Sequence, residues 1–336
     1  MRKYNFLFFI GIILLFSSCA KKNKFDIDIS DSNLKIEIKR LDKDLFAIDF
    51  NDAPNSISQL KENYGDFFIL YNSRVLNLGN SNNPAYPEYL ISFLTDYSIN
   101  NIYEKTMLVF QDITPIESEI NKAFRYYHYY FPDHKIPAIY TFIGGFNQSI
   151  VVADSILAIG LDKYLGSDCD FYNRLETPKY MQVNMHKAKI PTDALRSWAL
   201  TEFVYNDSID NLVNNMIYHG KIQYFLDAMF PETPDTLKFG FTNQQLEWCI
   251  KNENQMWNML IDQKLLFSTD YMTINKFINP APFTSGFPHE SPGRAVVWLG
   301  HKIIQKYMTR HPKITLEQLM ANNKYQKILS ESRYEP

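Results

Sequence analysis

The thiol of Cys19 is the group whose position most clearly predicts chemistry. Two basic residues at 2–3 are followed by an uncharged apolar run at 6–16, and two serines at 17–18 precede the cysteine. This order is typical of a signal peptide, and the run is shorter than the roughly 20 residues that a spanning helix requires. We predict that residues 1–18 are removed and that Cys19 becomes the lipidated first residue of a lipoprotein. A plain secretory signal with a chance cysteine is the alternative.

Lipid on Cys19 would anchor the protein firmly, because each buried methylene contributes about 0.8 kcal/mol and several acyl chains, palmitate among them, add together. Residues 19–28 are polar and lysine-rich, as a flexible tether is. We expect residues 29–336 to form a single domain that faces the periplasm. Ala20, rather than aspartate, follows the cysteine, which favours the outer over the inner membrane.

Few other groups have the spacing of a catalytic site. Seven histidines are scattered along the chain, and no two stand four residues apart as a zinc-binding His-x-x-x-His pair does. No Gly-x-Ser-x-Gly elbow is present, and the glycines at 144–145 indicate a turn rather than a phosphate loop. From the residues alone we predict no catalytic group, no cofactor and no metal site.

Composition narrows the classes of partner. The formal net charge is −3 at pH 7, so a nucleic-acid partner is not expected. An aromatic content of 15% predicts a folded chain rather than a disordered one. Besides Cys19, the cysteines are Cys169 and Cys249. An exported compartment permits a disulfide between them, and two separate buried thiols are the other possibility.

Alternation and turn residues predict a small sheet in the first half of the chain. Residues 34–40 alternate apolar and charged side chains, while 136–143 and 149–160 are rich in β-branched and aromatic residues. The glycines at 144–145 separate two of these runs, and 153–155 divides the last run into two short strands. Because tight turns join neighbouring strands, we expect a small antiparallel sheet.

Helical patterns dominate the remaining sequence, and each has a start signal such as proline or a capping side chain. The expected helices are residues 116–131, one that starts at Pro191, one from 207–208 to about Phe230, and one from 291–292 to Arg310. Strands early and helices late indicate an α+β fold that is predominantly helical.

Short segments spread over nearly the whole mature chain resemble segments of one known family. They are 41–46 (LDKDLF), 160–166 (GLDKYLG), 216–218 (MIY) with 220–221 (GK), 227–229 (DAM), 248–249 (WC) with 252–253 (NE), 266–270 (LFSTD), and 291–294 (SPGR) with Trp298. Together with the lipoprotein signal, they resemble the gliding motility lipoprotein GldB family. The resemblance implies a role in surface gliding of the cell and contacts with other envelope or motility proteins.

That family is distantly similar to predicted zinc peptidases, which carry His-Glu-x-x-His on one helix and a further glutamate ligand on the next. Two histidines four apart share a helix face and bind zinc, while the glutamate acts as general base. Here the resemblance places Thr201 and Tyr205 at the histidine positions, Glu202 at the general-base position and His219 at the third-ligand position. It therefore implies a zincin-like scaffold that has lost its metal ligands.

Two functions of different class follow. One is a non-enzymatic, membrane-anchored component of the envelope machinery for gliding, with a degenerate metallopeptidase site. The other is an envelope zinc-dependent peptidase-like hydrolase with Glu202 and His219 as candidate catalytic residues. The missing ligands favour the first function. The simplest view of Glu202 and His219 is that they are ordinary polar residues at helix ends.

Arg294 follows the helix-start signal at 291–292 and is expected in the first helical turn. The helix dipole disfavours a cation there. We therefore expect a carboxylate or a carbonyl oxygen as its partner, with a structural salt bridge as the main interpretation and a ligand-binding arginine as the alternative.

Overall fold

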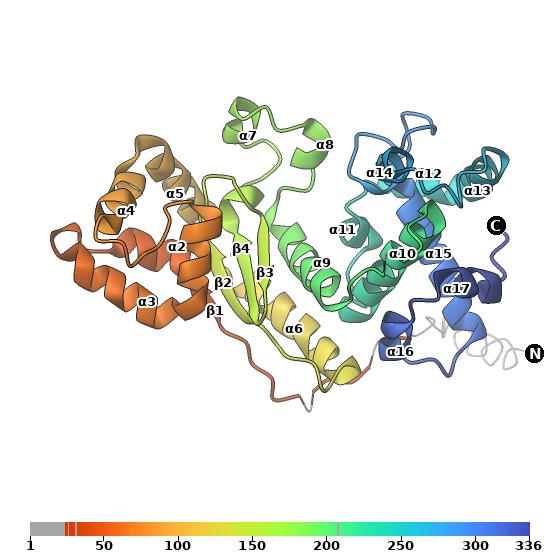
Figure 1. The fold of residues 1–336 in the computed structure, drawn as a ribbon, viewed down its shortest axis with the longest axis horizontal. Helices are drawn as coiled ribbons and strands as arrows, with labels where there is room; N and C mark the ends of the chain where they lie inside the picture. The colour runs from red at the N-terminus through yellow and green to blue at the C-terminus, as the bar shows by residue number, and fades with distance from the viewer. Residues whose placement is uncertain (1–23, 26, 31, 207) are drawn as a thin grey trace, which may run out of the picture.

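The computed structural model of this chain describes residues 24–25, 27–30, 32–206 and 208–336. The predicted signal peptide at 1–18 and the predicted lipid site at Cys19 lie outside the described residues. Helices dominate and the strands form one small sheet (Figure 1), so the predicted α+β, predominantly helical class is confirmed. Within the described ranges, no helix has the length and the apolar character that crossing a membrane requires.

The elements run in chain order from a short first strand to a long series of helices. The strands are β1 Ile38–Arg40, β2 Ala138–Phe142, β3 Ile150–Ala153 and β4 Ile156–Gly160. The helices are α2 Leu41–Asp44, α3 Ala53–Leu70, α4 Tyr86–Thr95, α5 Tyr97–Val109, α6 Thr114–Tyr130, α7 Asp170–Arg174, α8 Lys179–Gln182, α9 Ile190–Glu202, α10 Leu212–Met229, α11 Asp235–Phe239, α12 Asn243–Lys251, α13 Glu253–Asp262, α14 Tyr271–Ile278, α15 Ala295–Arg310, α16 Leu316–Ala321 and α17 Tyr325–Ser332.

The sheet is mixed, with the strand order β1-β2-β4-β3. β1 and β2 are parallel, β2 and β4 are parallel, and only β3 and β4 are antiparallel. The expectation of an antiparallel sheet is therefore wrong. The hairpin at 154–155 does make β3 and β4 antiparallel, but residues 143–149 are long enough to carry the chain past the neighbouring position to the sheet edge. β4 then returns beside β2 in the same direction.

The two faces of the sheet contact different sets of helices. Ile139 and Leu157 belong to the larger hydrophobic cluster, which includes residues of α6, α9 and α10. Tyr140 and Phe142 belong to a second cluster with α3 and α4. Successive side chains of a strand point to opposite faces, so one short strand serves both clusters. Figure 1 shows α2 to α5 on one side of the sheet and α6 and α9 on the other.

Helices α10 and α15 form the centre of the C-terminal half and pack more extensively than any other described pair. Nearly every residue of α10 is buried, as expected for a helix without a polar face. The two backbones touch at Gly220 and Gly300, where a Cβ on Gly300 would lie 1.8 Å from the carbonyl oxygen of Met216. Only glycine permits this crossing.

Several predicted boundaries shift by a few residues. The helix expected after 207–208 begins at Leu212, where Asn211 provides the capping side chain. The helix expected at 291–292 begins only at Ala295, because Arg294 has a positive φ of 55°. The predicted strand at 34–40 is reduced to Ile38–Arg40.

Packing of the N-terminal segment begins before the predicted boundary at residue 28. Phe25 is buried, and its ring meets Tyr224 edge-on at 5.2 Å between centroids. Nζ of Lys24 donates a hydrogen bond to the hydroxyl of Tyr224 at 2.5 Å. The body therefore includes part of the predicted tether. Cys169 and Cys249 are both buried free thiols, in agreement with the second of the two possibilities for this pair.

Candidate functional site

Glu202 is the last residue of α9 and contacts α6 and the loop that follows it. Its Oε2 accepts a hydrogen bond from the hydroxyl of Tyr127 at 3.4 Å and lies 3.3 Å from Nδ1 of His134. The ring of His134 in turn packs against Phe131 and Phe203. Glu202 is thus held beside aromatic side chains where the ends of α6 and α9 meet.

His219 lies elsewhere, on α10. It lines a cavity of about 290 Å³ together with Arg196 and Arg294, and Glu202 is not among the lining residues. Nδ1 of His219 is buried and has no hydrogen-bond partner among the described residues. Burial, and then the two guanidinium groups, lower the pKa of His219 to about 3. The imidazole is therefore neutral at pH 7.

Thr201 and Tyr205, which the resemblance places at the positions of the peptidase histidines, make a contact within a helix and a contact with a distant segment, respectively. The hydroxyl of Thr201 donates to the carbonyl oxygen of Ser197 at 3.2 Å within α9. The ring of Tyr205 stacks on Tyr325 with centroids 5.5 Å apart. Among the described residues, no three His, Cys, Asp or Glu side chains are grouped as metal ligands would be. The structure does not bring Glu202 and His219 into one site, and the absence of a cofactor and a metal stays a prediction.

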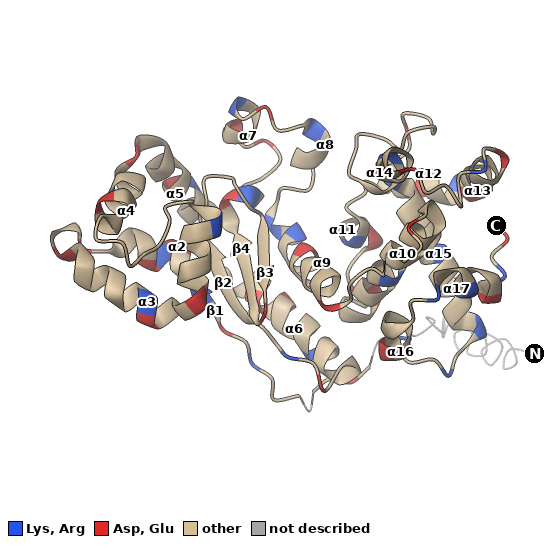
Figure 2. Ribbon diagram, in the orientation of Figure 1, with Lys and Arg blue, Asp and Glu red and all other residues tan. Residues whose placement is uncertain are grey.

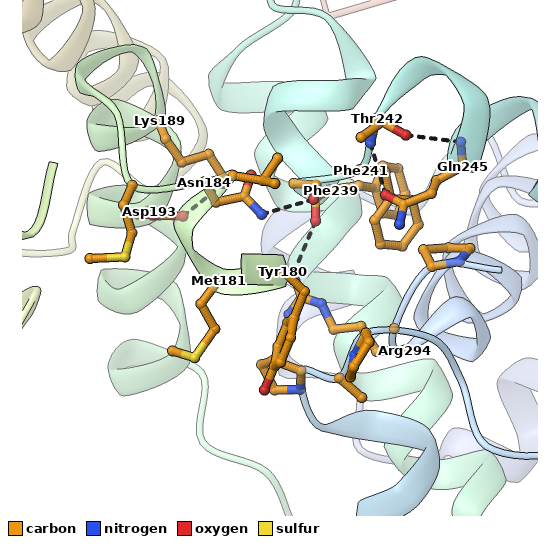
Figure 3. A pocket seen from close by; sticks show the side chains of 18 of the residues that line it. Tyr180, Met181, Asn184, Lys189, Asp193, Phe239, Phe241, Thr242, Gln245 and Arg294 are labelled. Carbon is orange, nitrogen blue, oxygen red and sulfur yellow. Dashed lines mark hydrogen bonds and ion pairs between the residues drawn. The ribbon is translucent and has the colours of Figure 1, made fainter. Parts of the chain in front are cut away.

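A cavity of about 370 Å³ lies between α8, α9, α11 and the loop before α15 (Figure 3). It adjoins the cavity at His219, and both are lined by Ser149, Tyr164, Asp193, Arg196, Pro280 and Arg294. We call the two together the charged pocket. Tyr180, Met181, Phe239 and Phe241 give it apolar walls beside the charged groups.

Lys189 and Asp193 form an ion pair at one side of the charged pocket. Nζ of Lys189 lies 2.7 Å from Oδ1 of Asp193, and the lysine side chain is only 4% exposed. The hydroxyl of Tyr164 donates to Oδ2 of the same carboxylate at 3.2 Å. Burial lowers the pKa of Lys189, while the Asp193 charge opposes this shift. Both oxygens of Asp193 are therefore already engaged.

Arg196 and Arg294 are the other strong charges of the charged pocket. Nη2 of Arg294 donates to the carbonyl oxygen of Phe239 at 3.0 Å. This is the second of the two expected kinds of partner, and the expected salt bridge is not present among the described residues. Arg196 has no hydrogen bond or ion pair within the described part of the chain. Burial lowers the pKa of both groups, and Arg196 lowers that of Arg294 further. Because guanidinium groups stay protonated in proteins, two cations face the same space.

Helix α9 and the residue before it, Lys189, hold three of these charges at a helical spacing. Lys189, Asp193 and Arg196 are spaced by four and three residues, which places them on one face of a helix. Basic and acidic positions accordingly alternate along α9 in Figure 2. Sequence reasoning missed this set, although the predicted start of the helix at Pro191 and the charge spacing were both available signals.

The backbone of the loop before α15 fixes Arg294. A Cβ on Gly293 would lie 2.1 Å from the carbonyl oxygen of Ala281, so the two loops touch there. The hydroxyl of Thr284 accepts the first N–H of α15 from Ala295 at 2.7 Å. This contact caps the helix after the predicted start signal at 291–292, and Arg294, the residue before the helix, has a left-handed conformation at the edge of the charged pocket.

A second buried polar cluster joins α10, α11 and α15. Oδ2 of Asp227 lies 2.6 Å from Nε2 of His301, and its Oδ1 lies 2.6 Å from Nζ of Lys238. His301 and Lys238 lower the pKa of Asp227 against the effect of burial. All three side chains are buried. This cluster ties three helices together, and we assign it a structural role.

A sequence model of one protein family, described as gliding motility protein GldB, matches residues 22–336. No curated protein and no solved structure matches the chain. The expected zincin-like scaffold thus has no structural relative to support it and stays a prediction.

Proposed function

This chain belongs to the gliding motility protein GldB family, and we propose that it serves gliding as a lipid-anchored, non-enzymatic component of the cell envelope. The observation that carries the proposal is the family match over residues 22–336, which covers almost everything after the predicted signal peptide. Membership of this family supports an involvement in gliding motility and the nature of the chain as a lipoprotein. The finer points, a periplasm-facing body that works through other envelope or motility proteins, are proposed.

The surroundings of Glu202 support the non-enzymatic part of the proposal. A zinc peptidase needs a glutamate beside two histidine ligands and an open metal position. Here Glu202 is held by Tyr127 and His134, whereas His219 lines a separate cavity. The alternative, a zinc-dependent peptidase-like hydrolase, would require these groups to come together.

The N-terminal packing supports a body held close to the membrane. Lys24 and Phe25 already contact the body, and Lys24 is five residues after Cys19. An extended residue spans at most about 3.6 Å, so the link from Cys19 to Lys24 covers no more than about 18 Å. An anchor on Cys19 would therefore keep the helical body beside the lipid headgroups.

The anchor is tested by Cys19→Ala in a strain that lacks the chromosomal gene. We expect this variant to leave the membrane fraction, to lack acyl groups on its N-terminal peptide by mass spectrometry, and to fail to restore gliding. Asn23→Ala, in the same segment, is the matched control and should restore gliding from the membrane fraction. A Cys19→Ala protein that stays in the membrane fraction and supports gliding would contradict the anchor.

A further inference from the structure

The charged pocket carries an excess of positive charge. Four cationic side chains line it, namely Lys163, Lys189, Arg196 and Arg294. Asp193 is the only carboxylate among the described residues that line either of its two cavities. Because Asp193 is engaged by Lys189 and Tyr164, no carboxylate remains to pair with the other three cations.

Other buried or partly buried cations of the described chain have partners. Lys238 pairs with Asp227 and a second aspartate, and Arg40 pairs with Asp42 at 2.6 Å. Lys221 donates to two backbone carbonyl oxygens at 2.9 Å each. Buried charges are normally compensated in this way, because a charged group that leaves water without gaining a partner loses much free energy of solvation. In the charged pocket, by contrast, Arg196 and Lys163 have no ion-pair partner among the described residues.

We propose that the charged pocket is a binding site for a phosphomonoester attached to a ring-bearing or apolar body. A phosphomonoester carries about 1.5 to 2 negative charges at neutral pH, which matches the excess of unpaired cations better than a single carboxylate does. Planar guanidinium groups suit phosphate oxygens because they can donate two parallel hydrogen bonds. The neutral His219, whose Nδ1 has no hydrogen-bond partner among the described residues, lines the smaller cavity.

The size and the walls of the charged pocket indicate the rest of the ligand. The cavities measure about 370 Å³ and 290 Å³, within the range of small-molecule sites. Tyr180, Phe239 and Phe241 line the larger cavity, so a ring can pack against aromatic side chains while the phosphate meets the arginines. This proposal does not rest on the role in gliding.

The test is calorimetric titration of the purified full-length lipoprotein in detergent with phenyl phosphate. We expect saturable binding with one site per chain. Arg196→Gln should weaken this binding at least about tenfold, the smallest change expected when a charge-assisted hydrogen bond is lost. Arg310→Gln is the matched control, because Arg310 is exposed at the far end of α15, and its affinity should equal that of the wild type.

A purely structural role for Arg196 is distinguished by the melting temperature without ligand. Removing one of two facing cations should leave that temperature unchanged or raise it, whereas loss of a structural contact would lower it. If Arg196→Gln does not fold, Lys163→Gln replaces it, since Lys163 lines the same cavity without an ion pair. The same loss of affinity is expected for either variant.

Two further ligands define the chemistry. Benzoate, with a single charge, and inorganic phosphate, without a ring, should each bind more weakly than phenyl phosphate. The proposal is overturned if the wild-type protein does not bind phenyl phosphate at millimolar concentration. It is also overturned if benzoate binds equally well, or if Arg310→Gln weakens binding as much as Arg196→Gln.

Discussion

At the scale of single residues, the charged side chains at α9 differ in whether they have an ion-pair partner. Lys189 is almost completely buried, and Asp193 is its only ion-pair partner among the described residues. Arg196, one turn further along, has no such partner. A buried ion pair adds little net stability, but breaking it leaves an uncompensated charge. The pair therefore holds the wall of the charged pocket in place, while the unpaired arginine is free to bind.

The variant Asp193→Asn tests this division of roles. It removes the charge that compensates Lys189 and keeps the shape of the side chain. Because Asp193 is 28% exposed, solvent softens the loss, and we expect the free energy of unfolding to fall by about 2 kcal/mol. Urea unfolding followed by circular dichroism measures the change.

The matched control is Asp170→Asn, whose carboxylate is 52% exposed and pairs with Lys105 and Arg174. Exposed pairs are worth about 1 kcal/mol or less. If the two variants lose equal stability, the buried pair does not support the wall of the charged pocket as we describe.

The candidate site shows which residues a sequence can predict. The sequence predicts the kind of partner that Arg294 has, a hydrogen-bond acceptor, because a cation at a helix start needs one. The placement of Glu202 was not, since its contacts Tyr127 and His134 are distant in sequence and meet it only through the packing of α6 on α9. The resemblance to zinc peptidases singles out Glu202 and His219. The spacing of Lys189, Asp193 and Arg196, which places them on one helix face, is also a signal in the sequence.

At the scale of elements, local signals predicted the helices and strands but not their order in the sheet. Proline and glycine marked the ends of α6, α9 and β2 within a few residues. The direction of β4 beside β2 depends on how far residues 143–149 carry the chain, which no local pattern specifies. The crossing of α10 and α15 likewise depends on Gly220 and Gly300 meeting from segments far apart in sequence.

The turn after β2 is held by a buried carboxylate. Oδ2 of Asp162 accepts hydrogen bonds from the backbone N–H of Gly144 at 3.1 Å and of Phe146 at 2.6 Å. Burial raises the pKa of Asp162 to about 6, against the effect of these hydrogen bonds. The aspartate of the unfolded chain has a pKa of about 3.9. As the pH rises, the unfolded chain therefore loses this proton before the folded protein does.

This shift predicts a pH dependence of stability. The contribution of Asp162 is fully present below about pH 4 and is lost as the pH rises through about 6, because the folded state then has to bury a charge. A shift of about two units corresponds to about 3 kcal/mol. We expect Asp162→Asn, which can still accept both N–H groups, to lack this fall, so the difference in stability between variant and wild type should change between about pH 4 and pH 7.

Urea unfolding at several pH values between about 4 and 7 measures this difference. Asp154→Asn is the control, since Asp154 is exposed in the hairpin between β3 and β4, and its stability should run parallel to that of the wild type. A difference between Asp162→Asn and the wild type that does not change with pH would contradict the assignment.

At the scale of the whole molecule, several features fit the proposed non-enzymatic role. Helices cover both faces of a small sheet and continue as a C-terminal group beside it (Figure 1). Lys24, close to the predicted lipid site, contacts Tyr224, and the charged pocket is lined by more cations than carboxylates. The family match covers this entire body. None of these features depends on Glu202 acting as a base.

The central claim, that the protein serves gliding without peptidase chemistry, is tested most directly by Glu202→Gln in a strain that lacks the chromosomal gene. Glutamine still accepts the hydrogen bond from Tyr127 but cannot act as a general base. We predict gliding equal to that of cells carrying the wild-type protein and of cells carrying Glu104→Gln, an exposed control on α5. A Glu202→Gln protein that is present in the membrane fraction, melts at the wild-type temperature and yet abolishes gliding would contradict the account.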